Sequence, residues 1–131
     1  MLAFLISSAA VLVADQAVKA AALRRRPAGE GPGFVYRENP SGALGAVSTP
    51  VSGAVLASAV ALFVAVLVLS DWPALMALGL GAATGGAASN FLDQATRGFV
   101  IDYLELPTGA TVNLGDVAIT VGVAVGVVAL L

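Results

Sequence analysis

The stretch WPALMALGLGAATGGAASN, residues 72–90, decides the fold of this chain. It contains no charged residue and begins with Trp72, which suits a membrane interface, and Pro73, which suits the first turn of a helix. About 20 apolar residues, at a rise of 1.5 Å each, cross a bilayer core of about 30 Å. We therefore expect a membrane-spanning helix over residues 73–92.

Small residues recur at every fourth position of this segment, at Gly81, Gly85 and Ser89. In a helix such residues share one face, and they let a neighbouring helix approach closely in a membrane. The spacing predicts a seam along which this helix packs.

The composition of the whole chain agrees with a membrane protein. Of its 131 residues, 59% are hydrophobic and 11% are charged, and the mean hydropathy is +0.97. Cysteine and histidine are absent, which excludes disulfides, thiol nucleophiles and imidazole metal sites. The net charge is −2, and the basic tract Arg24, Arg25 and Arg26 is short, so we expect no nucleic-acid partner.

Four apolar segments are long enough to consider as spans, and together they predict one domain, an all-α membrane protein of four transmembrane helices. They cover residues 2–23, 51–69, 73–92 and 117–131. Asp15 and Lys19 interrupt the first segment and no positive region precedes it, so we interpret it as a retained helix and not a signal peptide. With four spans, the long connections 24–50 and 93–116 lie on the same side of the membrane.

Polar residues gather beside these segments. Asp15 and Lys19 are four apart and share a helical face, where they can form an ion pair, brace a polar site between helices, or do both. Asn90 and Asp93, with Gln94 beside them, end the third span.

Asn113 and Asp116 precede the fourth span, where either residue suits a helix N-terminus. Capping does not account for Asp102, in the same connection. Two carboxylates brought close together cannot both ionise cheaply, so they share a proton and can serve as one acid and one base. Such a pair can activate water against an amide without serine, cysteine, histidine or metal. We therefore hypothesise a dyad of Asp102 and Asp116.

Four motifs in order resemble the lipoprotein signal peptidases, the type II signal peptidases of bacteria. They are DQAVK (15–19), RENPSGALG (37–45), GGAASNFLDQATRGFVIDYLEL (85–106) and VNLGD (112–116). The resemblance implies an intramembrane aspartic endopeptidase that cuts the signal peptide from a prolipoprotein before its lipid-modified cysteine. Asp102 and Asp116 match the catalytic pair. The positions expected to support the site or bind substrate are Asp15, Lys19, Asn39, Gly42, Asn90, Asp93, Gln94 and Asn113.

The resemblance also implies the surroundings of the protein. The family needs no metal or organic cofactor, and its partners are the prolipoprotein and membrane lipids. We expect a monomer in the bacterial inner membrane, with the site on the extracytoplasmic side and a small element, with short strands, between the first two spans. Every Lys and Arg lies in or beside the two long connections, which by the positive-inside tendency favours the opposite orientation.

Several residues depart from the family pattern, and they leave other functions open. The departures are Ser41, Leu44, Ser89, Gln94, Val112 and Gly115. Gln94 matters most, because it stands where the family pattern has an arginine. An arginine beside carboxylates orients them through paired hydrogen bonds, and glutamine cannot. The alternatives are a paralogue of different specificity, a non-catalytic protein that binds lipidated or helical partners, and a proton or cation conduit.

Overall fold

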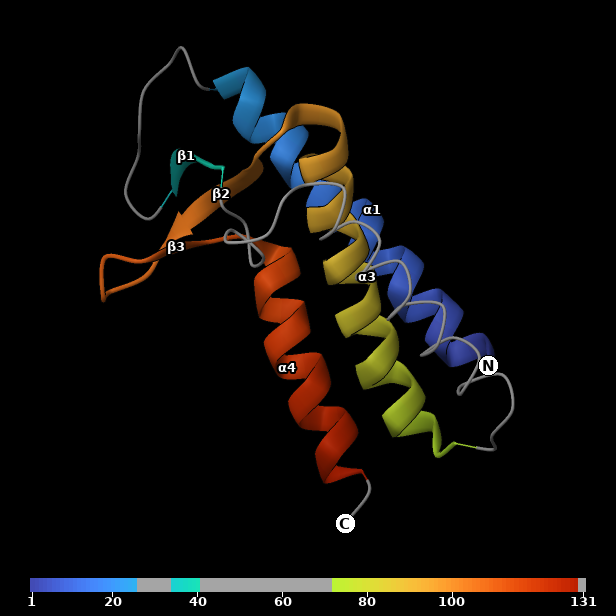
Figure 1. Cartoon of the computed structure of the whole chain (residues 1–131). Coiled ribbons are helices and arrows are strands. Elements are labelled where there is room, and N and C mark those ends of the chain that lie inside the picture. Colours follow the sequence, from blue (N-terminus) through green and yellow to red (C-terminus); the bar gives the residue numbers. More distant parts are fainter. Residues whose placement is uncertain (26–33, 41–71, 130–131) are drawn as a thin grey trace.

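The computed structural model describes residues 1–25, 34–40 and 72–129 (Figure 1). Three helices and three strands make up this part of the chain. In chain order they are α1 (Leu2–Arg25), β1 (Phe34–Asn39), α3 (Ala74–Arg97), β2 (Val100–Glu105), β3 (Thr111–Val112) and α4 (Leu114–Val128). The expected span 51–69 and Gly42 lie outside the described residues.

Helix α3 packs along both α1 and α4 (Figure 1). A Cβ atom at Gly85 would lie 2.3 Å from the carbonyl oxygen of Ser8 in α1, and one at Gly86 would lie 2.4 Å from that of Gly115 in α4. Neither distance is possible between real atoms, so both positions need glycine. The packing seam predicted at Gly81 and Gly85 is confirmed, and α3 carries a second seam on the side facing α4.

The ends of α3 have local causes. Pro73, expected in the first turn, is the cap residue directly before α3, so the helix begins one residue later than predicted. At the other end Gly98 adopts φ 80°, a left-handed conformation that glycine favours, and its N–H donates to the carbonyl oxygen of Gln94. The helix therefore runs to Arg97, beyond the predicted end at residue 92, and it includes Asp93 and Gln94.

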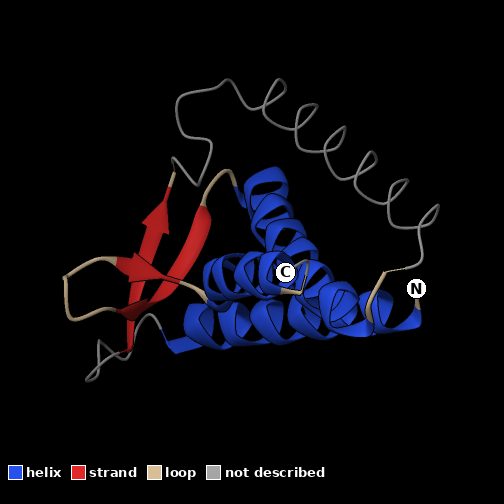
Figure 2. Ribbon diagram, turned by 90° about the horizontal axis from the view of Figure 1, so that it is seen from below, coloured by secondary structure: helices blue, strands red, loops and turns tan. Residues whose placement is uncertain are grey.

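The described part is helical with a small β element, as expected, but that element is an antiparallel sheet in the order β1-β2-β3, and β2 and β3 were not predicted. Strand β1 lies in the connection where short strands were expected. Strands β2 and β3 come from the second connection, so the sheet joins the two connections in one layer. Asn39 pairs with Val100 and Arg37 pairs with Asp102 across β1 and β2. Figure 2 shows the sheet at one end of the helices.

By length and composition, two helices of the described part, α1 and α3, could cross a membrane. Helix α4 is shorter, with 15 residues, and starts at Leu114 instead of the predicted residue 117. It starts earlier because Asn113 caps it: the Asn113 side chain accepts from the N–H of Asp116, and the Asp116 side chain accepts from the N–H of Asn113.

Candidate active site

A group of polar side chains is buried where the sheet meets the helices. Each of them is at most 2% exposed, and they come from α1, α3, β2 and the cap of α4. They are Asp15, Lys19, Ser89, Asp93, Asp102 and Asn113. Because buried polar groups are costly without partners, the hydrogen bonds of this cluster determine how the elements meet.

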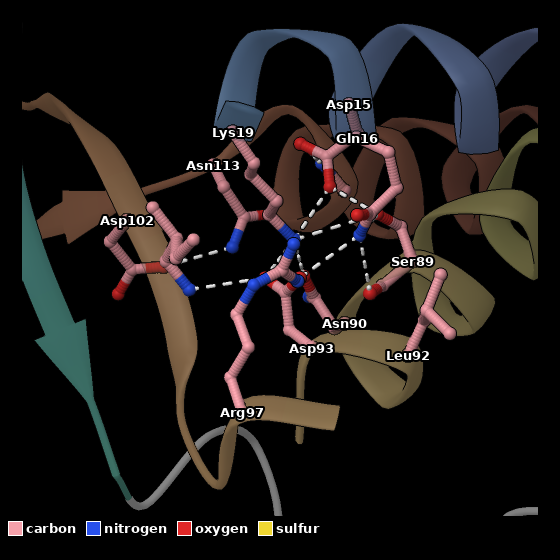
Figure 3. Close-up of polar contacts among 12 residues, drawn as sticks. Asp15, Gln16, Lys19, Ser89, Asn90, Leu92, Asp93, Arg97, Asp102 and Asn113 are labelled. Atoms are coloured by element: carbon pink, nitrogen blue, oxygen red, sulfur yellow. Dashed lines mark hydrogen bonds and ion pairs between the residues drawn. The ribbon is translucent and has the colours of Figure 1, made fainter. Parts of the chain in front are cut away.

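Lys19 lies at the centre of the cluster (Figure 3). Its Nζ lies 2.6 Å from Asp15 Oδ2 and 3.0 Å from Asp93 Oδ2, and it donates to Asn90 Oδ1 at 2.8 Å. The expected ion pair between Asp15 and Lys19 is present. Lys19 also binds Asp93 and Asn90 of α3, so the residues form an ion pair within α1 and also brace the polar group between α1 and α3.

Asp93 gathers donors from three elements. Arg97, one turn later in α3, forms an ion pair with Asp93 Oδ1, and Gln16 Nε2 of α1 donates to the same oxygen at 3.0 Å. The main-chain N–H of Ile101 in β2 donates to Asp93 Oδ2 at 3.2 Å. Gln16 was not among the predicted site residues, although its spacing of three from Lys19 places it on a nearby face of α1.

Asp15 joins α1 to the other elements. Ser89 Oγ donates to its Oδ2 at 2.5 Å, and the Tyr103 hydroxyl donates to its Oδ1 at 2.9 Å. Its Oδ1 also accepts from the N–H of Gly115 at 3.2 Å. Ser89, a departure from the family pattern, therefore has a defined partner here. Tyr103 was not predicted, because nothing in its sequence context distinguishes it from a packed aromatic residue.

The first four main-chain N–H groups of α4 all have acceptors, although a helix cannot supply them from within. Counted from the cap residue, they are satisfied as follows: Asn113 by the Asp116 side chain, Leu114 by the Tyr103 hydroxyl, Gly115 by Asp15, and Asp116 by the Asn113 side chain. Two of the four acceptors come from α1 and β2. The position of α4 is therefore tied to both.

Asp102 projects from β2 and is 2% exposed. Asn113 Nδ2 donates to its Oδ1 at 2.8 Å, and Asn39 Nδ2 donates to its Oδ2 at 3.2 Å. Burial raises the pKa of Asp102, the two asparagine bonds lower it, and the nearby charge of Asp116 raises it further. The net direction of the pKa is upward, which favours the protonated form.

Asn113 links the two aspartates that the sequence singled out. Its Nδ2 donates to Asp102, its Oδ1 accepts from the Asp116 N–H at 2.9 Å, and its own N–H donates to Asp116 Oδ2 at 3.2 Å. Asn90 Nδ2 donates to Asp116 Oδ1 at 2.8 Å. The structure thus brings Asp102, Asp116 and the three predicted asparagines into one hydrogen-bonded group, with Lys19 bound to Asn90.

Gln94, which departs from the family pattern, and Glu105 of β2 lie apart from this group. Gln94 Nε2 donates to the carbonyl oxygen of Gly98 at the end of α3, and its Oε1 is buried with no partner among the described residues. Glu105 is exposed at the end of β2. Within residues 1–25, 34–40 and 72–129, no group of three acidic, histidine or cysteine side chains is placed to hold a metal ion.

The fold and the buried group define a helical integral membrane protein with a small antiparallel sheet beside a site of aspartates and asparagines. The same fold occurs in a solved chain described as a bacterial membrane enzyme, with a TM-score of 0.78, 21% identity, and coverage of 98% of this chain and 92% of that one. A second chain of the same description has a TM-score of 0.69 and 20% identity, and the match covers 97% and 86% of the two chains.

The family model described as Signal peptidase (SPase) II matches residues 7–131, and the chain belongs to this family. A lipoprotein signal peptidase of Moorella thermoacetica is 33% identical over 97 residues, which are 69% of this chain and 62% of the relative. One from Syntrophomonas wolfei is 38% identical over 65 residues, 47% of this chain and 44% of the relative. The chain therefore spans less than two thirds of the length of these two relatives.

Proposed function

We propose that this protein is an intramembrane aspartic endopeptidase that removes the signal peptide from lipid-modified prolipoproteins, with Asp102 and Asp116 as the catalytic pair. The observation that carries the proposal is the position of Asn113, which is hydrogen-bonded to both aspartates and buried between them. Membership of the signal peptidase II family, whose members are proteases, supports the same function.

The chemistry follows from the environment of each carboxyl group. Asp102, whose pKa is raised chiefly by burial, is the group that holds a proton. Asp116, whose oxygens accept from Asn90 and from the main chain of Asn113, is the base. Asp116 takes a proton from water, the hydroxide adds to the scissile carbonyl carbon, and Asp102 donates its proton to the carbonyl oxygen. As the tetrahedral intermediate collapses, the C–N bond breaks, the amide nitrogen takes up the proton that Asp116 holds, and a hydroxyl of the intermediate returns a proton to Asp102.

Substrate positioning has a simple physical source in this proposal. The signal helix enters between the membrane-spanning helices, and each lipid methylene buried in the membrane adds about 0.8 kcal/mol of anchoring. The site lies on the extracytoplasmic side. The distribution of cations opposes this orientation less than the sequence suggested, because Lys19 and Arg97 are bound to buried carboxylates and are not free loop charges.

Cleavage of a diacylglyceryl-modified prolipoprotein in nanodiscs tests the proposal. We expect Asp102→Asn and Asp116→Asn each to lower kcat by about 10³-fold while the protein still inserts, because each removes one proton-transfer group. Glu105→Gln, which neutralises an exposed carboxylate on the same strand as Asp102, is the matched control and should cleave normally. Full cleavage by both aspartate variants would refute the dyad. Proton or cation flux through liposomes without peptide would instead indicate a conduit.

A further inference from the structure

Tyr103 occupies a position that the proposed chemistry does not use. It directly follows Asp102 in β2, its side chain is 3% exposed, and its hydroxyl lies among polar groups of two other elements. The hydroxyl donates to Asp15 Oδ1 of α1 and accepts from the N–H of Leu114, the first residue of α4, both at 2.9 Å. One oxygen atom therefore joins β2, α1 and α4.

The register of the sheet shows that the main-chain pairing of β2 with β3 ends beside Tyr103. Strands β2 and β3 pair at Glu105 with Thr111 and at Leu104 with Val112. The next pair in an antiparallel ladder would be Tyr103 with Asn113, but the chain turns into α4 at Asn113. The Tyr103 hydroxyl accepts from the residue after Asn113, so a side-chain bond continues the connection where the main-chain ladder ends.

The ring of Tyr103 is held in place by its neighbours. It packs in a buried cluster with Ala22 and Ile101, and its centroid lies 6.1 Å from that of Phe34. Burial raises the pKa of the Tyr103 phenol above its usual value, so the hydroxyl keeps its proton and remains a donor. A fixed ring with a fixed hydroxyl forms a rigid spacer between β2 and the start of α4.

We propose that Tyr103 is a positioning residue that sets the separation and orientation of Asp102 and Asp116. Asp102 is its neighbour in β2, and Asp116 lies two residues after Leu114 in the first turn of α4. The proposal rests on the proposed catalytic role of these two aspartates. In this role the Tyr103 side chain acts through the main chain of β2 and of the first turn of α4, and not by direct contact with the carboxyl groups of Asp102 and Asp116.

Steady-state kinetics of Tyr103→Phe test the proposal on the full chain in nanodiscs. The substitution keeps the ring and removes the hydroxyl, and we expect kcat to fall about tenfold, the effect of one buried hydrogen bond. KM should stay within about twofold, because substrate contacts are unchanged. Tyr36→Phe is the matched control: the same atom is removed from the neighbouring strand β1, where the hydroxyl donates to Glu38 at 3.0 Å. Its kcat should equal that of the wild type.

A double-mutant cycle separates positioning from a general loss of stability. Asn113→Ala already breaks the link between Asp102 and Asp116, so Tyr103→Phe should lower kcat by no more than about threefold in that background. Full additivity of the two effects on kcat would show that Tyr103 stabilises the fold without positioning the pair. So would a wild-type kcat for Tyr103→Phe.

Amide hydrogen exchange gives a readout that needs no substrate. Loss of the hydroxyl should make the Leu114 amide exchange faster in Tyr103→Phe than in Tyr36→Phe or the wild type. An unchanged Leu114 amide would overturn the inference whatever the activity. If Asp102→Asn and Asp116→Asn retain cleavage, the proposed function fails; if they lose it while Tyr103→Phe keeps a wild-type kcat, only the positioning role fails.

Discussion

Two pairs of carboxyl groups lie at the same end of this molecule, and their partners differ. Asp15 and Asp93 form ion pairs with Lys19, and Asp93 forms a second one with Arg97. The hydrogen bonds that Asp102 and Asp116 accept come from amide groups. Their donors are the side chains of Asn39, Asn90 and Asn113 and the main chain of Asn113.

We interpret the difference as a separation of carboxylates with a structural role, Asp15 and Asp93, from the two that we propose to be catalytic. A buried cation holds a carboxylate in its charged form, and such a pair fixes elements together. An amide donor orients a carboxyl group without neutralising it, so the group can still gain or lose a proton. Lys19 binds Asn90, and Asn90 binds Asp116, so a neutral side chain connects the ion-paired group to the proposed catalytic pair.

Removing Lys19 should have the largest effect. In Lys19→Met the buried carboxylates of Asp15 and Asp93 lose their shared cation, and we expect a loss of about 3–5 kcal/mol in the free energy of unfolding. Thermal melting in one detergent measures the change. Asp102→Asn is the control, because it replaces a carboxyl group whose buried charge is unfavourable and should leave the melting temperature equal or higher. If Asp102→Asn unfolds the protein and Lys19→Met does not, the distinction between the ion-paired and the amide-bonded carboxyl groups is wrong.

Truncating Asn113 should affect activity more than stability. Asn113→Ala removes the bond to Asp102 and the cap of α4, and we expect kcat to fall about 10²-fold through misorientation of the pair. The loss of the cap should cost about 1 kcal/mol of stability. Prolipoprotein cleavage and melting of the same preparation measure both. A loss of activity no larger than the loss of folded protein would contradict the orienting role.

The smallest expected effect is on the pH dependence of stability, through the raised pKa of Asp102. Its pKa is raised from 3.8, so the folded protein binds this proton more tightly than the unfolded chain does. Its contribution to stability is therefore greatest below this usual pKa and declines as the pH rises through the raised value. The melting temperature of the wild type should fall relative to Asp102→Asn across that window.

The same titration reports on the second aspartate. Because the charge of Asp116 raises the pKa of Asp102, Asp116→Asn should lower that pKa toward 3.8. Carboxyl carbon NMR of labelled aspartate measures the shift. No change in the Asp102 pKa would show that the two groups do not interact as a pair.

The sequence predicted best where a pattern is local. The start of α3 beside Pro73 and the glycine seam follow from composition and periodicity, and a capped helix N-terminus at Asn113 or Asp116 follows from their residue types. Strands β2 and β3 were missed because they are short and lie in a connection rich in turn residues. Strand β2 also pairs with β1, which is distant in the chain.

The amino-acid sequence by itself determined a membrane protein without histidine or cysteine, with its acidic and amide residues beside apolar helices. Only the tertiary structure decided which carboxylates have cation partners and which have amides. It also revealed Gln16 and Tyr103, whose bonds to Asp93 and Asp15 join residues 77 and 88 positions apart. The physical reason is that periodicity records which face of an element is apolar, whereas a hydrogen bond between distant residues exists only after packing has set their distance.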